Sequence, residues 1–361
     1  MLQKKSTVSS FPMGEEGCFL CIDKPKGPTS HQVDHWVREI TGVEKVGHVG
    51  TLDPQATGLL VMAMGKAVRL VEIAHEQPKE YIASMKLHSQ VDEKSIRDVF
   101  NIFTGTIYQL PPLKSAVVRR IRPKKIYELE IMEIDDRDIL FRVKCESGTY
   151  VRTLCLDIGY ILGTRANMTD LRRTSTLPFT EKDCITLQQL SDYMILAQKG
   201  NDKLLRAAIY SPSFLFSPYP KVVVKDSAVG TISHGSDLYP GGLKAIIGNP
   251  LEGDRVGVFS EGGKLVGTGK MLISYNQIME TKIVDFDRVL VDPGPAKHMK
   301  TEPEKVKPEV RTYGDRGSRP RKNDAYSRQP DRNHHGSSHE KRNFSGNERA
   351  RRPEQRERRR R

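Results

Sequence analysis

The last 69 residues of this 361-residue chain, 293–361, contain no Leu, Ile, Trp or Cys, whereas 37% of the whole chain is hydrophobic. Such a segment cannot bury enough apolar surface to offset the entropy that a chain loses when it becomes ordered. We therefore predict a disordered tail at 293–361 and confine the folded structure to residues 1–292. A folded part of that length suggests about two domains.

Most of the net positive charge lies in the same tail. Residues 293–361 hold 21 Lys or Arg and 10 Asp or Glu, which gives +11 of the +13 carried by the whole chain. A basic tail attracts nucleic acid regardless of its sequence. The alternative is a solvated tail that only improves solubility. The folded part is nearly neutral overall, so its function has to be inferred from its motifs.

The composition excludes several classes of protein. No segment approaches the ~20 apolar residues of a membrane-spanning helix, and residues 1–17 lack the apolar segment of a secretion signal. Five cysteines are too few for a disulfide scaffold. Cys18 and Cys21 form a single C-x-x-C, which could be half of a zinc or redox site, but reduced cytoplasmic thiols are the default. The histidines are scattered and there is no P-loop motif, so we expect neither a metal nor a nucleotide cofactor.

The hydrophobic pattern predicts a mixed α+β domain over residues 18–210. Strands are predicted at 18–23, 59–64, 79–87, 126–134 and 139–145, and helices at 31–41, 67–75, 92–103, 150–162 and 187–198. Residues 45–58 contain several glycines and a proline and are predicted to be a loop. Because the elements do not alternate in βαβ order, we expect a largely antiparallel sheet.

A second, glycine-rich domain is predicted at residues 219–292. Five short apolar segments separated by turn residues suggest a small β-barrel, with strands at 221–225, 245–247, 254–259, 264–267 and 283–291. Serine and proline residues at 211–218 predict a linker between the two domains. Residues 1–17 are predicted to be an N-terminal extension.

The best candidate for chemistry is Asp53, within the sequence GHVGTLDPQATG at 47–58. Glycines allow a backbone to approach a ligand closely, and Pro54 restricts the chain directly after the carboxylate. A carboxylate on such a loop suits covalent catalysis by aspartate. The alternative is an aspartate that only braces its own turn.

Other residues could assist Asp53 or bind RNA. Arg152, one turn into a predicted helix, could face Asp53 and keep it ionised, or form an ordinary structural ion pair. Tyr81 could stack on a base, or be an ordinary strand aromatic. A basic segment could contact phosphates, or be a solvated charged strand. The members of this segment are Lys114, Arg119, Arg120, Arg122, Lys124 and Lys125. A second short basic patch is formed by Arg172 and Arg173.

Five motifs resemble those of TruB-type pseudouridine synthases and occur in the family's order. They are DKPKGPTSH at 23–31, GHVGTLDPQATGLL at 47–60, KEY at 79–81, SGTYVR at 147–152 and LRRT at 171–174. The segments 108–117, 143–149, 224–229 and 234–235 are similar to the archaeal and eukaryotic branch of the family, which includes dyskerin. The resemblance covers about residues 18–290 and leaves out the tail.

The resemblance implies a pseudouridine synthase catalytic domain followed by an RNA-binding PUA domain. It implies that Asp53 is the nucleophile that attacks a flipped-out uridine, that Tyr81 stacks on the base and assists proton movement, and that Arg152 pairs with Asp53. Supporting roles are implied for Leu171 in the pocket wall, Lys24 and Pro25 beside the catalytic loop, and His48 near the extruded nucleotide. No cofactor and no metal are implied.

The resemblance also implies partners. These are RNA, namely tRNA, an H/ACA guide RNA or rRNA, and the small proteins of the H/ACA particle: a zinc-ribbon-like peptide, a β-barrel subunit and a kink-turn binder. The expected location is the cytoplasm for an archaeal source and the nucleolus for a eukaryotic one. Three functions are compared: the catalytic subunit of a guide-RNA particle, a stand-alone tRNA-modifying enzyme, and an RNA-binding scaffold without activity. The presence of Asp53, Tyr81 and Arg152 argues against the scaffold.

Overall fold

The computed structural model describes residues 11–112, 118–278 and 281–292, and the structural statements below concern these residues. The predicted disordered tail at 293–361, most of the N-terminal extension and the RNA-contact candidate Lys114 lie outside them. The described residues form an α+β part built on a large sheet and a smaller part built on a second sheet. None of the described helices is both long enough and apolar enough to cross a membrane.

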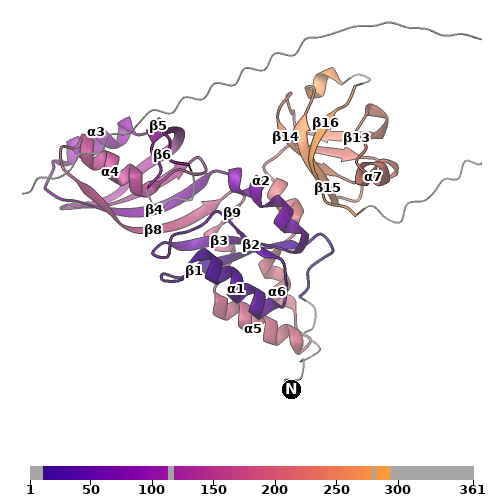
Figure 1. Cartoon of the computed structure of the whole chain (residues 1–361), viewed down its shortest axis with the longest axis horizontal. Coiled ribbons are helices and arrows are strands. Elements are labelled where there is room, and N and C mark those ends of the chain that lie inside the picture. Colours follow the sequence, from indigo (N-terminus) through magenta and orange to yellow (C-terminus); the bar gives the residue numbers. More distant parts are fainter. Residues whose placement is uncertain (1–10, 113–117, 279–280, 293–361) are drawn as a thin grey trace, which may run out of the picture. The chain divides into compact units, whose positions relative to one another are not determined.

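The first part contains an eleven-stranded sheet (Figure 1). Its strands follow the order β10 (Cys184–Ile185), β1 (Cys18–Lys24), β3 (Thr57–Met64), β8 (Ala166–Thr176), β4 (Lys79–Leu87), β7 (Asp138–Cys145), β6 (Arg122–Asp135) and β5 (Gly105–Gln109). Three short strands lie beside this path: β2 (Val46–Val49) on β3, β9 (Phe179–Thr180) on β8 and β11 (Ile209–Tyr210) on β1. Among the described strands of this sheet, only the pairs β1–β10 and β3–β8 are parallel. The prediction of a largely antiparallel α+β domain is confirmed.

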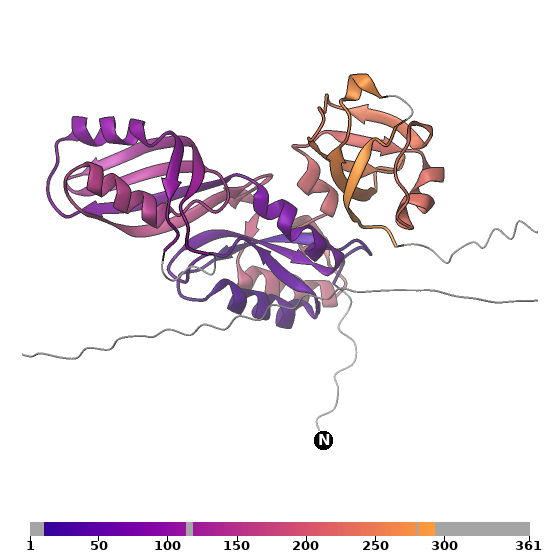
Figure 2. The same cartoon turned by 45° about the horizontal axis from the view of Figure 1, so that its top comes forward.

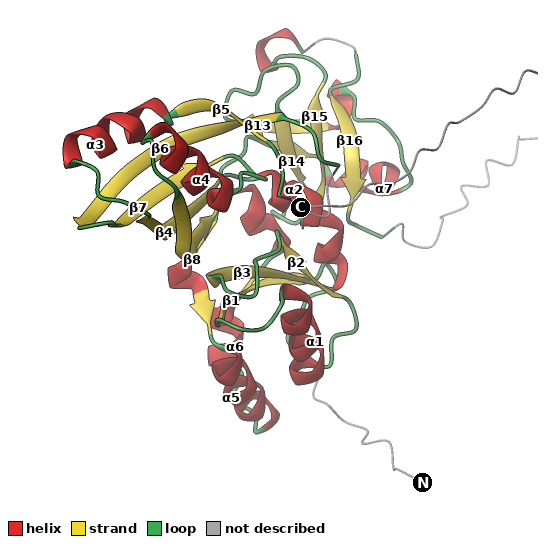
Figure 3. Ribbon diagram, turned by 60° about the vertical axis from the view of Figure 1, so that its left-hand side comes forward, coloured by secondary structure: helices red, strands yellow, loops and turns green. Residues whose placement is uncertain are grey.

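Helices cover both faces of the sheet around β1 and β3. On one face lie α1 (Ser30–Thr41), α5 (Leu187–Gln198) and α6 (Lys203–Ala208), whose apolar residues share a buried cluster with Leu20 and Ile22 of β1 (Figure 3). The opposite face, with Phe19 and Cys21, packs against α2 (Val71–Glu76). Successive residues of a strand point to opposite faces. Because helices cover both faces here, side chains on both sides of β1 are buried, and the strand is apolar almost throughout.

The other half of the sheet is covered by α3 (Glu93–Ile102) and α4 (Val151–Ile161), which contact each other over β4, β6, β7 and β8 (Figure 2). Phe100 of α3 meets Phe141 of β7 with ring centroids 5.5 Å apart in an edge-to-face arrangement. The Asp92 side chain accepts a hydrogen bond from the Ser95 N–H and so caps α3. This second hydrophobic cluster fixes α4, and α4 carries Arg152.

The two halves of the sheet meet where β3 pairs with β8. This parallel pairing involves only Thr57 and Gly58 of β3 and Arg172 and Arg173 of β8. Gly58 has φ +92°, and a Cβ at this position would lie 2.4 Å from the Arg173 carbonyl oxygen. Only glycine fits here without moving the backbone. The β2–β3 loop (residues 50–56), which contains Asp53, therefore ends at the junction of the two halves.

The second part is a five-stranded sheet in the order β13 (Leu243–Ile247), β12 (Lys221–Val224), β14 (Arg255–Phe259), β15 (Leu265–Met271) and β16 (Val284–Val289). One helix, α7 (Asp226–Ser233), follows β12. The core of this second part includes the fully buried Val222, Val258 and Val266. All five strands overlap the segments predicted from the sequence, whereas α7 was not predicted.

Several elements differ from the predictions. The predicted loop at 45–58 contains the strand β2, and the predicted helix at 67–75 is a 3₁₀ turn (Gly65–Leu70) followed by α2. The strand β8 and the helix α6 were not predicted. The expected linker at 211–218 contains a 3₁₀ turn (Pro212–Phe216) with Leu215 and Phe216 fully buried. Further 3₁₀ turns lie at Glu181–Asp183, Pro240–Gly242 and Tyr275–Gln277.

Candidate active site

Asp53 and Arg152 form an ion pair, although 99 residues separate them in the sequence. Arg152, the second residue of α4, donates a hydrogen bond from Nη2 to Asp53 Oδ2. The Asp53 side chain is 56% exposed. A guanidinium hydrogen-bonded to a carboxylate restricts its orientation. The pair therefore presents a directed and accessible carboxylate.

The β2–β3 loop is held from one side by Lys24, the last residue of β1. Lys24 is completely buried, and its Nζ donates to the carbonyl oxygens of Pro54 (3.2 Å), Ala56 (2.8 Å) and Pro25 (2.9 Å). All three N–H donors of the ammonium group are thus used. Burial lowers the pKa of Lys24, and the negative charge of Asp53 opposes this shift.

The loop is held from another side by α1. The Ser30 hydroxyl accepts a hydrogen bond from the Leu52 N–H (2.9 Å) and lies 3.0 Å from the Leu52 carbonyl oxygen. The Ala56 N–H donates to the Asp53 carbonyl oxygen (3.0 Å) and closes a turn. It is therefore the Asp53 main chain that takes part in this turn, while the carboxylate points to Arg152. Anchoring of this kind fixes a reactive group before substrate binds.

Arg173 connects the start of the loop with Tyr81. Arg173 is buried in β8, and its guanidinium donates to the carbonyl oxygens of Leu59 (2.8 Å) and Gly50 (3.0 Å). Tyr81 of β4 is its partner across the sheet. Burial raises the pKa of Tyr81, and the positive charge of Arg173 partly offsets the shift. Tyr81 therefore keeps its phenolic proton near neutral pH.

Arg172 and Arg173 do not form the second basic patch that the sequence predicts. Arg173 is buried, and Arg172 forms a two-pronged ion pair with Asp23 (3.0 and 3.3 Å) and a further one with Glu181 (2.9 Å). Both side chains satisfy internal acceptors because β8 lies in the interior of the sheet. Arg173 is also the site residue that sequence reasoning missed, since its charge suggested the surface.

Leu171 lies on the same face of the sheet as Tyr81. It is paired with Ala83, two residues after Tyr81 on β4, and residues two apart on a strand share a face. Both side chains are partly buried and pack against the hydrophobic clusters of both halves of the sheet. The two residues thus offer an apolar wall and an aromatic ring near the junction that ends the β2–β3 loop.

His48 of β2 is tied to α1 instead of being free. Its Nδ1 lies 2.8 Å from Asp34 Oδ2, and its Nε2 lies 3.1 Å from the hydroxyl of Thr51 in the β2–β3 loop. The His31 ring is at 5.0 Å, edge-on. The His48 side chain is only 8% exposed.

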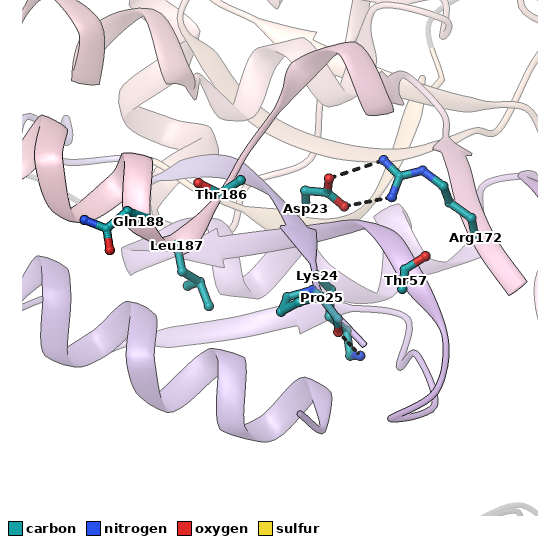
Figure 4. Close-up of a pocket in the computed structure, with 8 residues that line it drawn as sticks. All are labelled: Asp23, Lys24, Pro25, Thr57, Arg172, Thr186, Leu187 and Gln188. Atoms are coloured by element: carbon teal, nitrogen blue, oxygen red, sulfur yellow. Dashed lines mark hydrogen bonds and ion pairs between the residues drawn. The ribbon is translucent and has the colours of Figure 1, made fainter. Parts of the chain in front are cut away.

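A pocket lies beside the loop, and Figure 4 shows its lining. Lys24, Pro25 and Thr57 line it together with the Asp23–Arg172 ion pair, whereas Asp53 is not among its lining residues. The remaining lining residues, Thr186, Leu187 and Gln188, come from the start of α5. The pocket therefore lies next to the supports of the loop and not over the carboxylate.

The predicted basic segment is only partly exposed. Arg119 and Arg120 are exposed, while Arg122 at the start of β6 is half-buried. Lys124 forms an ion pair with Glu146 (3.0 Å) and donates to the Ser147 carbonyl oxygen (2.7 Å). Lys125 is exposed too and lies over the Tyr127 ring, with Nζ 5.6 Å from the ring centroid. In the described part of the chain, Arg119, Arg120 and Lys125 are thus the members best placed to meet a phosphate.

The C-x-x-C pair does not have the character of a reactive or metal-binding site. Cys18 and Cys21 are buried in β1, and burial raises the pKa of Cys18 to about 12 and that of Cys21 well above its usual value. Thiolates bind metals and attack disulfides, and protonated thiols do neither efficiently. Both cysteines therefore act as small apolar residues of the core.

Comparison with known families matches three consecutive segments of the chain. Residues 38–151 match the family described as TruB family pseudouridylate synthase (N terminal domain). Residues 152–212 match the tRNA pseudouridylate synthase B C-terminal domain, and residues 220–290 match the PUA domain.

Similar whole proteins include several named probable tRNA pseudouridine synthase B. The protein of Thermoplasma acidophilum is 56% identical over 274 residues, which cover 76% of this chain and 75% of the relative. The protein of Methanocaldococcus jannaschii is 46% identical over 279 residues, which cover 76% of this chain and 83% of the relative.

Two solved structures are similar in fold and sequence. A chain in the crystal structure of a Cbf5-Nop10-Gar1 complex has a TM-score of 0.72 and 40% identity, covering 77% of this chain and 86% of that one. A chain in the structure of an H/ACA RNP bound to a substrate RNA containing 2'-deoxyuridine has a TM-score of 0.71 and 38% identity, covering the same shares.

Proposed function

The chain belongs to the TruB family of pseudouridine synthases, which isomerise uridine in RNA, and we propose that Asp53 is the nucleophile of this reaction here. The observation that carries the proposal is the ion pair between Asp53 and Arg152 on a loop anchored by Lys24 and Ser30. An ionised carboxylate of fixed direction, accessible from solvent, is what covalent catalysis by aspartate requires.

The isomerisation exchanges one glycosidic bond for another. The bond between N1 and C1' of the uridine breaks, the base turns, and a new bond forms between C5 and C1'. The C5 proton is released and N1 gains a proton, so the product has the same composition as the substrate. A covalent bond between Asp53 and either the sugar or the uracil ring would hold one fragment while the base turns.

The residues around Asp53 suit a base that has left the RNA stack. Flipping a base costs a few kcal/mol, which stacking and pocket contacts must offset. We assign this task to Tyr81, whose ring can stack and whose retained proton can serve as a hydrogen-bond donor, and to Leu171 as an apolar wall. Arg152 would keep the carboxylate aligned until the base arrives.

We propose that RNA is held by the PUA domain and by exposed basic residues such as Arg119 and Arg120. Charge-based contacts to phosphates add affinity without selecting sequence. Target choice would then come from a guide RNA, as in an H/ACA particle with its small protein subunits. The similarity to a chain from a Cbf5-Nop10-Gar1 complex and to one from an H/ACA RNP with substrate RNA supports this assignment.

A guide-independent activity on tRNA is the second candidate, because the similar archaeal proteins are named probable tRNA pseudouridine synthase B. Both functions use the same chemistry and differ in how the uridine is chosen. The geometry of Asp53 serves either equally well.

One experiment tests the proposal and separates the two functions. Tritium release from tRNA labelled at uridine C5 is measured with the purified full chain, first alone and then with guide RNA and the small particle proteins. Activity of the chain alone supports the tRNA function, and activity only with the added components supports the guide-dependent one. Release by Asp53→Asn at the wild-type rate in either setting would overturn the proposed nucleophile.

A further inference from the structure

Two histidines and an aspartate from separate elements lie together at the start of the β2–β3 loop. They are His31 and Asp34 of α1 and His48 of β2, and one potential ligand atom from each lies within 4.8 Å of the others. Asp34 Oδ2 is 3.4 Å from His31 Nδ1 and 2.8 Å from His48 Nδ1. Residues three apart on a helix share a face, which explains why His31 and Asp34 meet.

The second observation concerns the buried carboxylate. Asp34 is only 5% exposed, and its Oδ1 is buried without a hydrogen-bond partner in the described part of the chain. A buried charge is normally paired with a cation or bound to a metal. Arg122 Nε and Thr176 Oγ1 are also buried without a partner there, but of the three only Asp34 belongs to a group that faces two potential metal ligands. A bound ion would explain the unsatisfied carboxylate. The charged groups in contact with Asp34 are the two histidines, which carry a charge only when protonated.

The surroundings of His48 resemble those of a metal ligand. Metal-binding histidines usually direct their second ring nitrogen to a hydrogen-bond acceptor, which fixes the tautomer. With Nδ1 of His48 directed at Asp34 Oδ2 (2.8 Å), its Nε2 lies 3.1 Å from the Thr51 hydroxyl. The tautomer with hydrogen on Nε2 would donate to Thr51 and leave Nδ1 free to bind an ion.

We propose that His31, Asp34 and His48 bind a divalent transition-metal ion of the zinc type. Ligands about 2 Å from a tetrahedral zinc ion are roughly 3.3 Å apart, and the two distances to Asp34 Oδ2 lie on either side of this value. His31 is on the solvent side, with its side chain 83% exposed, so a fourth position is open to water. Two imidazoles and a carboxylate suit zinc better than magnesium or calcium, which prefer all-oxygen sites.

The ion would link α1 to the loop that carries Asp53. His48 is the third residue of β2, and Thr51, which supports it, lies two residues before Asp53. The metal would thus act together with Ser30, whose hydrogen bond joins the same helix to Leu52. We assign it a structural role in ordering the loop, and no step of the isomerisation passes through it.

The experiment measures binding of Zn²⁺ and Co²⁺ to untagged full-length protein that has been stripped with a chelator and dialysed. Titration calorimetry gives affinity and stoichiometry, and the visible absorption of Co²⁺ reports the geometry and donor set. His334, His335 and His339 of the tail can bind zinc weakly. The decisive quantity is therefore the difference in zinc affinity and stoichiometry between wild type and each variant. His31→Ala removes an exposed ligand without disturbing the core, and Asp34→Asn removes the central one.

The matched control is His35→Ala, because His35 lies on the same helix, is exposed and pairs with Glu39 at 3.4 Å. We expect one ion bound more tightly than the rest in wild type and His35→Ala, at least tenfold weaker binding in His31→Ala, and loss of that ion in Asp34→Asn. Zinc at about 100 times its Kd should raise the Tm of wild type by roughly 5 °C. Equal zinc binding by wild type and His31→Ala, or no such ion in wild type, would overturn the proposal and leave Asp34 as a residue that only orients His48.

Discussion

The free energy of unfolding should rise with pH just above neutrality, because Lys79 is buried. Replacing Lys79 by Met should remove this rise. Lys79 is the first residue of β4 and is almost completely buried. Its Nζ donates to the Gln77 carbonyl oxygen (2.7 Å) and the Ser147 hydroxyl (3.2 Å). Burial, assisted by the nearby charge of Arg173, lowers the pKa of Lys79 from 10.5 to about 7.

The size and sign of the effect follow from this shift. In the unfolded chain a lysine has a pKa of about 10.4, so it is protonated throughout the range from pH 7.5 to 8.5. In the folded protein Lys79 is mostly neutral there, so the unfolded state binds nearly one proton more. Stability therefore rises with pH, by about 1.2 kcal/mol per pH unit. Between pH 7.5 and 8.5 the free energy of unfolding of wild type should therefore rise by about 1.2 kcal/mol more than that of Lys79→Met.

The assay is urea unfolding at pH 7.5, 8.0 and 8.5, followed by circular dichroism and by the fluorescence of Trp36, the single tryptophan. Lys79→Met also loses hydrogen bonds, but that shifts its stability by a similar amount at each pH and leaves the slope unaffected. The control is Lys86→Met on the same strand, since Lys86 is exposed and pairs with Asp138 at 2.7 Å. Parallel pH profiles for wild type and Lys79→Met would refute the reasoning.

Three further predictions concern the loop, the nucleophile's partner and the tail. Ser30→Ala should lower the free energy of unfolding by about 1–2 kcal/mol, because the buried Leu52 N–H loses its acceptor; an unchanged urea midpoint would contradict this. Arg152→Ala should reduce the single-turnover rate of pseudouridine formation at least tenfold with little change in RNA affinity, and the reverse pattern would make Arg152 an RNA contact. Deleting residues 293–361 should flatten the dependence of log K for RNA on log salt, and an identical slope would show that the tail makes no phosphate contacts.

The sequence predicts elements well where one side of the element is consistently apolar. The alternation at 79–87 predicts β4 with its observed bounds, and the helix predicted at 31–41 is α1, which Thr29 and Gly42 cap. The alternation of β8 is interrupted, because a register shift against β4 brings Met168 and Leu171, three residues apart, to the same hydrophobic cluster. Arg173, farther along the strand, is buried through hydrogen bonds to carbonyl oxygens. Satisfied polar burial of this kind leaves no periodic signal in the sequence.

The site is less predictable than the fold, because it depends on contacts between distant segments. Resemblance to a family directs attention to Asp53 and Arg152, yet spacing alone cannot show that α4 delivers Arg152 to a loop 99 residues earlier. The proposed metal site illustrates the same limit. The scattered histidines indicate no metal in the sequence, because the histidine that joins His31 near Asp34 comes from β2, whereas His35 of the same helix pairs with Glu39.

The most direct test of the account is a comparison of Asp53→Asn with Asp138→Asn, which alters another exposed, ion-paired carboxylate. Single-turnover pseudouridine formation and the Kd for the same RNA are measured for both variants and for wild type. We predict that Asp53→Asn forms no detectable product while its Kd stays within about threefold of wild type, and that Asp138→Asn matches wild type in both. Product formation by Asp53→Asn at a rate close to that of wild type would contradict the assignment of Asp53 as the nucleophile.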